Sequence, residues 1–408
     1  MSKLNSQHIL IYIPYLDQRY GGIRQYTTNL LRTLSNLDQN KFKISVLHYN
    51  NDTEIIKVIK SLPILNLITK NEVKLPNFLL IKNHSAKKIA QLIQFFFGTK
   101  RYPIKIKNEL DFLVEKKGIT IIHSPYQEFP SLSKKIYKIA TLHDVQELYF
   151  PEFFTAETRA QRAKDYLSIV KECDTIVVSY QHIKDDLVKY FNGDSTKIKV
   201  VLLPMNNLWF NYLSHETPIN NDLVQKLPKD YILYPANSWK HKNHLGLIKA
   251  VKYIIHEKKK NINLILTGNL DTEFGNELKQ LVKELGLYDN ILFFGIVPEE
   301  VLLYLYKRCK GVVIPTLYEA GSFPLMESIL LGVPVIASNV TSLPETIDNN
   351  EYVFDPNNTE ELAHKLMLLN SDEDYRTNSI LNSNRVKSRL LNTGAENSFN
   401  EIYLNQTK

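Results

Sequence analysis

Glu319 and Glu327 flank a short segment that brings carboxylates and backbone N–H groups close together. Carboxylates accept hydrogen bonds from sugar hydroxyls, and the N–H groups at the start of a helix attract phosphate. Between the two acids, the N–H groups of Ser322, Phe323 and Leu325 are candidates for such contacts. The pattern therefore suits a sugar joined to phosphate, as in a nucleotide sugar.

The residues around this pair predict the elements that position it. The apolar run 311–317 predicts a buried strand, Pro324 is favourable in the first turn of a helix, and Gly332 predicts that helix's end. Glu319 is then expected in the strand-to-helix loop, with Glu327 one turn inside the helix. The plain alternative is that Glu327 only complements the helix dipole and Glu319 is a solvated loop acid. Spacing alone favours that alternative.

Other candidates are weak when taken singly. His143 and Asp144 end a predicted strand, but a lone histidine there is more often structural. Lys242 in a loop is, by itself, more often a solvated charge. Gly21 and Gly22 precede a predicted helix and permit backbone N–H groups to face a phosphate or an acceptor, although an ordinary tight turn has the same composition.

Strand-like and helix-like segments alternate along the 408 residues, which predicts an α/β protein with parallel sheets in two domains. The predicted strands are 9–14, 119–123, 139–143, 175–179, 197–203, 231–235, 263–267, 291–295, 311–315 and 333–338. The predicted divisions are an N-terminal domain (1–205), a linker (206–229), a C-terminal domain (230–385) and a helical tail (386–408) that packs back on the first domain. Ligands of open α/β sheets bind outside the carboxyl ends of the strands.

The composition indicates a protein of a reducing compartment. Cys173 and Cys309 are too few for a disulfide framework or a cysteine-based metal site. The chain shows no signal-peptide layout and no apolar stretch long enough to span a bilayer. We expect a cytoplasmic location, with attachment to the inner face of the membrane as an open question.

That question arises from a basic segment. Residues 57–107 hold ten lysines, one arginine and one acid, a local net charge of +10 against +7 for the whole chain. Five apolar and aromatic residues accompany them between 92 and 97. A basic, aromatic helix is typical of an anionic membrane surface, whereas packing of the aromatic side chains into the N-terminal core is an equal alternative. No nucleic-acid motif accompanies the charge, so a nucleic-acid partner is not expected.

Two further classes of site are disfavoured. No Gly-x-Gly-x-x-Gly occurs in the chain, which argues against a dinucleotide-dependent dehydrogenase. His241 and His244 flank Lys242 without an acidic or cysteine companion at ligand spacing, so no metal site is predicted.

Several motifs now fall into one order. They are the Gly-Gly turn, Thr141-Leu-His-Asp144, Val177-Val-Ser179, the segment from Tyr234-Pro-Ala to His244, Phe294-Gly-Ile-Val-Pro-Glu-Glu300, the two-Glu loop and Leu331-Gly-Val-Pro to Glu345. In this order they closely resemble the retaining glycosyltransferases of family four, within the group-one glycosyl transferases. The resemblance runs from about residue 9 to residue 356. It implies the GT-B fold, two Rossmann-like domains whose parallel sheets face a central cleft.

The resemblance assigns donor-binding roles to the two-Glu loop. Glu327 would hold the ribose hydroxyls, and Glu319 the hydroxyls of the transferred sugar. Backbone N–H groups complete the site, at Ala320, Gly321 and Ser322 for the sugar and at Ser322, Phe323 and Leu325 for the pyrophosphate. Gly321 lets the backbone approach the sugar because it has no side chain.

The remaining implied roles lie in other loops. Lys242 would neutralise the diphosphate as charge develops on the leaving group, and backbone groups near Ile296 and Val297 would hold the base. His143 would lie close to the transferred sugar. This sequence has Ala236 where an arginine often accompanies the lysine. The second charge would then come from Lys240 or Arg24. Tyr126 and Asp144 are candidates for the acceptor.

The implied activity is transfer of a hexose from a nucleoside diphosphate sugar to an acceptor hydroxyl, with retention at the anomeric carbon. His143, Lys242 and Glu319 would carry the catalysis, with neither a cofactor nor a divalent metal. The form of the Tyr234–His244 segment tilts the donor towards mannose, and the basic segment tilts the acceptor towards a polysaccharide or lipid-linked glycan. The rival functions are a non-catalytic GT-B partner subunit and a nucleotide-sugar epimerase.

Overall fold

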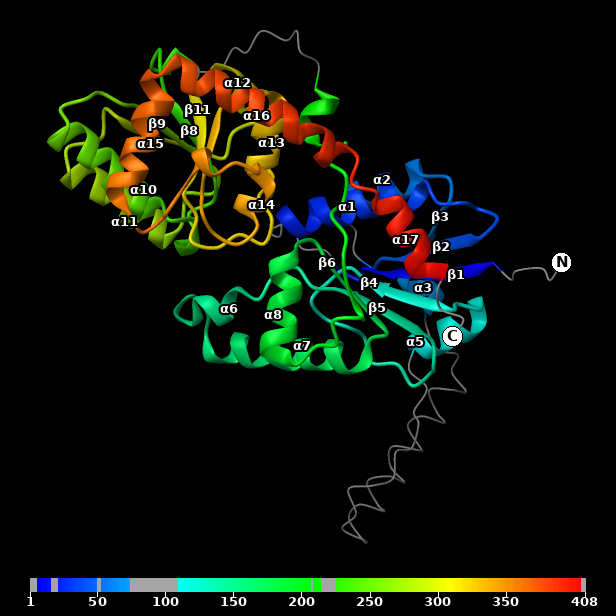
Figure 1. The fold of residues 1–408 in the computed structure, drawn as a ribbon. Coiled ribbons are helices and arrows are strands. Elements are labelled where there is room, and N and C mark those ends of the chain that lie inside the picture. Colours follow the sequence, from blue (N-terminus) through cyan, green and yellow to red (C-terminus); the bar gives the residue numbers. More distant parts are fainter. Residues whose placement is uncertain are drawn as a thin grey trace.

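The computed structural model describes residues 6–15, 21–49, 53–73, 109–206, 208–213 and 225–404. Within them the chain forms two lobes, each built on a parallel sheet (Figure 1). The interior strands of both sheets are largely buried, because helices cover both faces of such sheets, whereas the edge strands β7 and β10 are more exposed. The predicted α/β class with two facing parallel sheets is confirmed.

The N-terminal sheet has seven strands in the order β3-β2-β1-β4-β5-β6-β7. They are β1 (Gln7–Tyr12), β2 (Phe42–Leu47), β3 (Leu65–Ile68), β4 (Ile121–Ser124), β5 (Tyr137–Thr141), β6 (Thr175–Val178) and β7 (Ile198–Val200). The interior strand β1 places Ile9 between Ile44 of β2 and Ile121 of β4. The two strands β2 and β3 were not among those predicted.

The helices of this domain connect the strands. They are α1 (Gly21–Ser35), α2 (Thr53–Ser61), α3 (Lys70–Val73), α5 (Glu109–Lys117), α6 (Gln146–Tyr149), the 3-10 turn η1 (Pro151–Phe153), α7 (Ala156–Glu172) and α8 (Gln181–Phe191). Most of the basic segment, residues 74–107, lies outside the described residues, and so do the aromatic residues between 92 and 97.

The C-terminal sheet has six strands in the order β10-β9-β8-β11-β12-β13. They are β8 (Ile232–Pro235), β9 (Leu264–Thr267), β10 (Ile291–Gly295), β11 (Gly311–Ile314), β12 (Val335–Ser338) and β13 (Val353–Phe354). The connecting elements are the 3-10 turns η2 (Trp209–Tyr212), η3 (Lys240–Lys242) and η5 (Asn350–Tyr352), the π-helical turn η4 (Tyr253–Glu257), and helices α10 (His244–Lys252), α11 (Glu273–Glu284), α12 (Glu299–Arg308), α13 (Phe323–Leu331), α14 (Leu343–Ile347) and α15 (Thr359–Ser371).

The last two helices return from the second lobe to the first (Figure 1). Helix α16 (Glu373–Leu391) buries Val386 and Leu390 in the C-terminal core, so the predicted start of the tail at residue 386 falls inside this helix. Helix α17 (Ala395–Leu404) instead buries Phe399 and Tyr403 in the N-terminal core. The Tyr403 hydroxyl lies 2.8 Å from Nδ1 of the buried His123, which ties this helix to β4.

The early part of the predicted linker also belongs to a core. Leu208 and Phe210, which precede β8, are buried in the C-terminal core. Among the described residues, no helix combines the length and apolar character needed to cross a bilayer.

Candidate nucleotide-sugar site

A cleft of about 1440 Å³ lies between the domains and is lined by residues of both. Loops at the carboxyl ends of β4, β5, β8, β10 and β11 form much of its wall, as expected for open parallel sheets. The predicted residues on the wall are Gly22, Tyr126, His143, Asp144, Lys242, Ile296, Val297, Glu319, Ala320, Gly321, Phe323 and Glu327. Residues more than 300 positions apart in sequence are thus brought to one cavity.

Two predicted donor residues, Ser322 and Leu325, do not line the cleft. Ser322 is the N-cap of α13, and its Oγ accepts a hydrogen bond from the Leu325 N–H at 3.4 Å. Both side chains are buried, because the helix uses them for its own cap and core. Gly332 ends the helix in the left-handed conformation, with φ of 68°, and Glu327 lies one turn inside it, as predicted.

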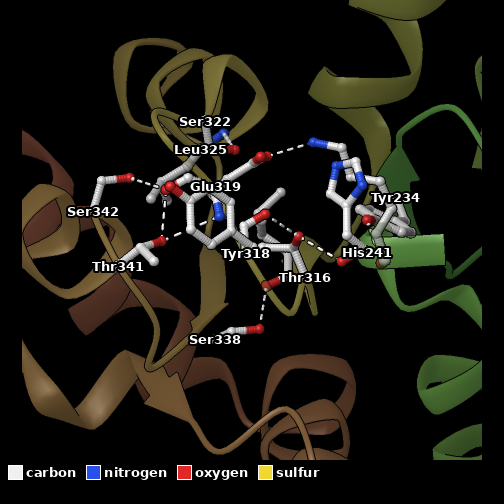
Figure 2. Close-up of polar contacts among 12 residues, drawn as sticks. Tyr234, His241, Thr316, Tyr318, Glu319, Ser322, Leu325, Ser338, Thr341 and Ser342 are labelled. Atoms are coloured by element: carbon white, nitrogen blue, oxygen red, sulfur yellow. Dashed lines mark hydrogen bonds and ion pairs between the residues drawn. The ribbon is translucent and has the colours of Figure 1, made fainter. Parts of the chain in front are cut away.

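The Glu319 backbone is held in place from a neighbouring loop (Figure 2). Its N–H donates to Thr341 Oγ1 at 3.1 Å, and its carbonyl accepts from Thr341 Oγ1 at 2.6 Å and from Ser342 Oγ at 3.0 Å. Three hydrogen bonds therefore fix the residue before any ligand arrives. Fixed polar groups are what a binding site needs in order to favour one orientation of a sugar.

The Lys242 ammonium lies 2.6 Å from Glu319 Oε1, and both side chains are largely buried. The loop that carries Lys242 is bound to the loop that carries Glu319, because Thr316 Oγ1 donates to the His241 carbonyl at 2.8 Å. The Tyr234 hydroxyl also holds this loop, because it donates to the Lys242 carbonyl at 2.7 Å. Figure 2 shows Tyr234 and His241 on one side of this network and Glu319 at its centre.

Glu327 is buried beside the cleft and has a donor on each oxygen. Trp209 Nε1–H donates to Oε1 at 2.8 Å, and the Tyr306 hydroxyl donates to Oε2 at 2.8 Å. Burial raises the pKa of Glu327, whereas these two hydrogen bonds act in the opposite direction. Sequence reasoning missed both donors, since they lie 118 and 21 positions away in no recognisable pattern.

His143 faces the cleft as a neutral ring. Burial lowers the pKa of His143 below its usual value. Its Nε2 lies 2.8 Å from the Pro125 carbonyl, which can only accept, so Nε2 carries the proton. Nδ1 is left as an acceptor, which is the function a sugar hydroxyl would need.

Asp144 is paired on the cleft wall with Arg162, a residue of α7 that the sequence did not single out. The Arg162 Nε also lies 2.8 Å from Glu147 Oε2. The other acceptor candidate, Tyr126, donates its hydroxyl to the Tyr15 carbonyl at 3.0 Å. On the N-terminal side the cleft therefore presents the Asp144 carboxylate, which Arg162 holds, whereas Glu147 is buried behind it.

Of the two candidates for a second cation, Lys240 lies on the cleft wall, whereas Arg24 is not among its lining residues. Ala236 itself lines the cleft. At the far side, Ile296 is 79% exposed in the loop after β10. Gly21 and Gly22 are the first residues of α1, and Gly22 reaches the wall.

The C-terminal domain matches the profile of the family "Glycosyl transferases group 1" over residues 217–386. The match covers less than half of the chain. The chain is 27% identical over 259 residues to O-antigen chain mannosyltransferase B of Escherichia coli, which covers 63% of this chain and 66% of the relative. It is 28% identical to the O-antigen chain mannosyltransferase RfbU of Salmonella typhimurium, covering 53% of this chain and 56% of the relative. The matched regions thus span less than two thirds of these relatives.

Solved structures show the same fold over nearly the whole chain. Sucrose-phosphate synthase from Thermosynechococcus elongatus superposes with a TM-score of 0.66 at 18% identity, covering 97% of this chain and 98% of that one. The Anabaena protein HepE in complex with UDP and glucose gives a TM-score of 0.66 at 14% identity, covering 98% and 99%. The chain therefore has the GT-B fold, as the sequence resemblance implied.

Within the described part of the chain, no three His, Cys, Asp or Glu side chains gather in a way that could hold a metal ion. The absence of a metal requirement stays a prediction. Whether the enzyme depends on magnesium or manganese is tested by activity in the presence of a chelator.

Gly321 approaches the opposite domain closely, which makes it sensitive to substitution. A Cβ on Gly321 would lie 2.9 Å from Cε2 of Tyr180, a buried ring at the end of β6. We expect Gly321→Ala to lower the free energy of unfolding by about 1–3 kcal/mol, because a packed ring must move. Urea denaturation measures this cost.

The matched control for this prediction is a double-mutant cycle. Tyr180→Ala removes the ring, so adding Gly321→Ala in that background should cost much less. An equal cost in both backgrounds would show that the glycine is needed for another reason.

Proposed function

We propose that this protein is a glycosyl transferase that moves a hexose from a nucleoside diphosphate sugar to a glycan hydroxyl, with retention at the anomeric carbon. Mannose is the favoured hexose. The observation that carries the proposal is the contact between Lys242 and Glu319 at 2.6 Å on the wall of the interdomain cleft. This contact places a cation that can pair with a diphosphate next to a carboxylate that can accept hydrogen bonds from a sugar. Both lie near the start of α13.

The arrangement supports a different protein group for each part of the donor. The α13 N-terminus attracts phosphate, and Lys242 adds a full positive charge within reach of it. Glu319, in the loop before α13, would hold hydroxyls of the transferred sugar. Glu327 would hold the hydroxyls of the ribose. When the donor binds, its diphosphate replaces the carboxylate as the partner of Lys242, so Glu319 is released towards the sugar.

The proposed reaction breaks the bond between the anomeric carbon and the diphosphate oxygen. The acceptor oxygen forms the new bond on the same face, and its proton passes to the departing phosphate oxygen. Lys242 stabilises the negative charge that develops on this leaving group. Glu319 and His143 orient the sugar, so most of the rate enhancement comes from orientation and charge stabilisation.

Mannose is favoured by the relatives, since both O-antigen proteins are named as mannosyltransferases. The same names support an acceptor from polysaccharide synthesis. The nucleotide is a separate question, because the base would be held by backbone groups around Ile296 and Val297. Such contacts are made by every residue type and leave no signature in the sequence.

Release of nucleotide tests the proposal. The purified protein is incubated with GDP-mannose and with UDP-hexoses in parallel, with and without candidate glycan acceptors, and the free nucleoside diphosphate is measured. We expect acceptor-dependent release from one donor, and its loss in Glu319→Gln, which keeps the side chain's shape. Equal release by the two proteins would contradict a catalytic site here.

The same assay separates the rival functions. A non-catalytic partner subunit would release nucleotide from none of the donors. An epimerase would change the sugar while leaving the diphosphate attached, which chromatography of the intact donor detects. Each outcome has its own product pattern.

Attachment to an anionic membrane surface is a second, separate proposal. It depends on the net charge of +10 within residues 57–107, most of which lie outside the described part of the chain. Sedimentation with vesicles should carry the protein down when they contain anionic lipid at low salt, and not when they are neutral. Equal recovery with both vesicles would reject the proposal.

A further inference from the structure

Glu327 is held by two side chains that lie outside its own loop and helix. Trp209 comes from η2, in the part of the chain that connects the two sheets, and Tyr306 comes from α12. Their donors reach different oxygens of the carboxylate, each at 2.8 Å. The carboxylate is therefore fixed at both ends.

In these hydrogen bonds, the chemistry of the groups decides which one donates and which one accepts. An indole N–H can only donate, so Trp209 requires an acceptor opposite it. Glu327 is 6% exposed and Tyr306 fully buried, so an unpaired carboxylate here would lack solvation by water. The two donors replace that water. They favour the ionised carboxylate, against the effect of burial.

Trp209 is itself held in place by its neighbours. Leu208 and Phe210 on either side are buried in the C-terminal core. The Trp209 ring lies 5.5 Å from the ring of Phe210 and 6.5 Å from that of Tyr306, measured between centroids. Just upstream, the Met205 N–H donates to the Leu390 carbonyl of α16 at 2.9 Å. The indole therefore has little freedom to leave Glu327.

A carboxylate held in this way keeps part of its capacity to accept. Each oxygen offers about two acceptor positions, of which Trp209 and Tyr306 occupy one each. The remaining positions match the two adjacent hydroxyls of a ribose. Glu327 also lies on the cleft wall, where such hydroxyls would arrive.

We propose that Trp209 is a positioning residue for nucleotide binding: its Nε1–H, together with the Tyr306 hydroxyl, holds the Glu327 carboxylate turned so that its free acceptor positions meet the ribose. This inference rests on the proposed function, in which Glu327 binds the ribose. If so, the segment that connects the two domains contributes to donor affinity. No motif of the two-Glu loop predicts this contribution.

Trp209→Phe is the direct test, because it keeps a ring and removes the N–H. With the donor identified by nucleotide release, we expect KM for that donor to rise about tenfold, which corresponds to one charge-assisted hydrogen bond, while kcat changes less than about threefold. Without the indole donor, Glu327 takes up a proton at higher pH. The rise in KM should therefore grow as the pH is lowered from 8 to 6, whereas the wild type changes little.

Two further variants make the result decisive. Tyr306→Phe removes the second donor from the other oxygen and should reproduce the same pH-dependent rise, even if Trp209→Phe folds poorly. The chain has two tryptophans, so Trp239→Phe leaves Trp209 as the sole tryptophan, whose emission can be excited selectively. In that background, titration with GDP or UDP, whichever the donor contains, should change the Trp209 emission.

The outcomes separate this inference from the proposed function. If the wild type releases no nucleotide from any donor, both are wrong. If it does, but KM in Trp209→Phe and in Tyr306→Phe is unchanged or rises equally at every pH, the positioning role is wrong and the transferase function stands.

Discussion

Replacing Lys242 with alanine is expected to lower kcat by about 10²–10³-fold, the usual cost of removing one group that stabilises a developing negative charge. The Lys242 ammonium is the cation in contact with Glu319 on the cleft wall, at 2.6 Å. Charge stabilisation is strong there because the lysine side chain is only 16% exposed and water is largely excluded. Steady-state kinetics with the identified donor measure the effect.

The same substitution should also weaken the fold. The Glu319 side chain is 10% exposed, so loss of Lys242 leaves a nearly buried charge without its partner. Removing one member of a buried pair costs about 3–5 kcal/mol, and the partial exposure here places the expected loss towards the lower end. Urea denaturation of the ligand-free protein separates this loss from the effect on kcat.

The chain offers a matched control for both effects. Lys279 forms an ion pair with Asp271 at 2.9 Å, but the side chains are 38% and 90% exposed. Lys279→Ala should change the free energy of unfolding by less than about 1 kcal/mol and leave kcat unchanged. If Lys242→Ala behaves like Lys279→Ala in the kinetics, Lys242 does not act on the leaving group.

Acidification is expected to produce the second large effect, a steep loss of stability below pH 6.5. Burial lowers the pKa of six histidines. They are His8, His123, His143, His182, His241 and His244. The pKa falls to about 3 for His123 and to about 4 for His244, and both side chains are fully buried. These rings stay neutral in the fold while the unfolded chain binds protons.

The sign follows from proton binding. Between pH 6.5 and the lowered pKa, the unfolded state binds more protons than the folded one, so the free energy of unfolding falls as the pH falls. Each fully buried histidine contributes a loss of about 3 kcal/mol between pH 6.5 and pH 4. Four carboxyl groups whose pKa burial raises, on Glu147, Asp186, Glu327 and Glu345, act in the opposite sense. We expect the six histidines to prevail.

Urea denaturation at half-unit steps from pH 7 to pH 4.5 measures this dependence. His244→Asn serves as the comparison, because one fewer histidine should reduce the slope by up to about 1.4 kcal/mol per pH unit, whatever the variant's absolute stability. A flat profile for the wild type, with no change of slope in His244→Asn, would show that the buried histidines do not control the pH dependence.

Local features of this protein were readable from its sequence because they depend on neighbouring residues. Pro324 and Gly332 delimit α13, and the apolar run before them forms β11, as expected from backbone preferences. The alternation of strands and helices predicted two parallel sheets. Strands β2, β3 and the two-residue β13 were not predicted. The family motifs cluster in the loops that reach the cleft.

The partners of the site residues were decided by the tertiary structure alone. The packing of separate elements brings three hydrogen-bonded pairs together. They are Trp209 with Glu327, Arg162 with Asp144, and Thr341 with Glu319. A single hydrogen bond between distant residues leaves no period or spacing in a sequence. The two glutamates could therefore be identified from the sequence alone. The contacts that orient them and set their charge exist only in the folded chain.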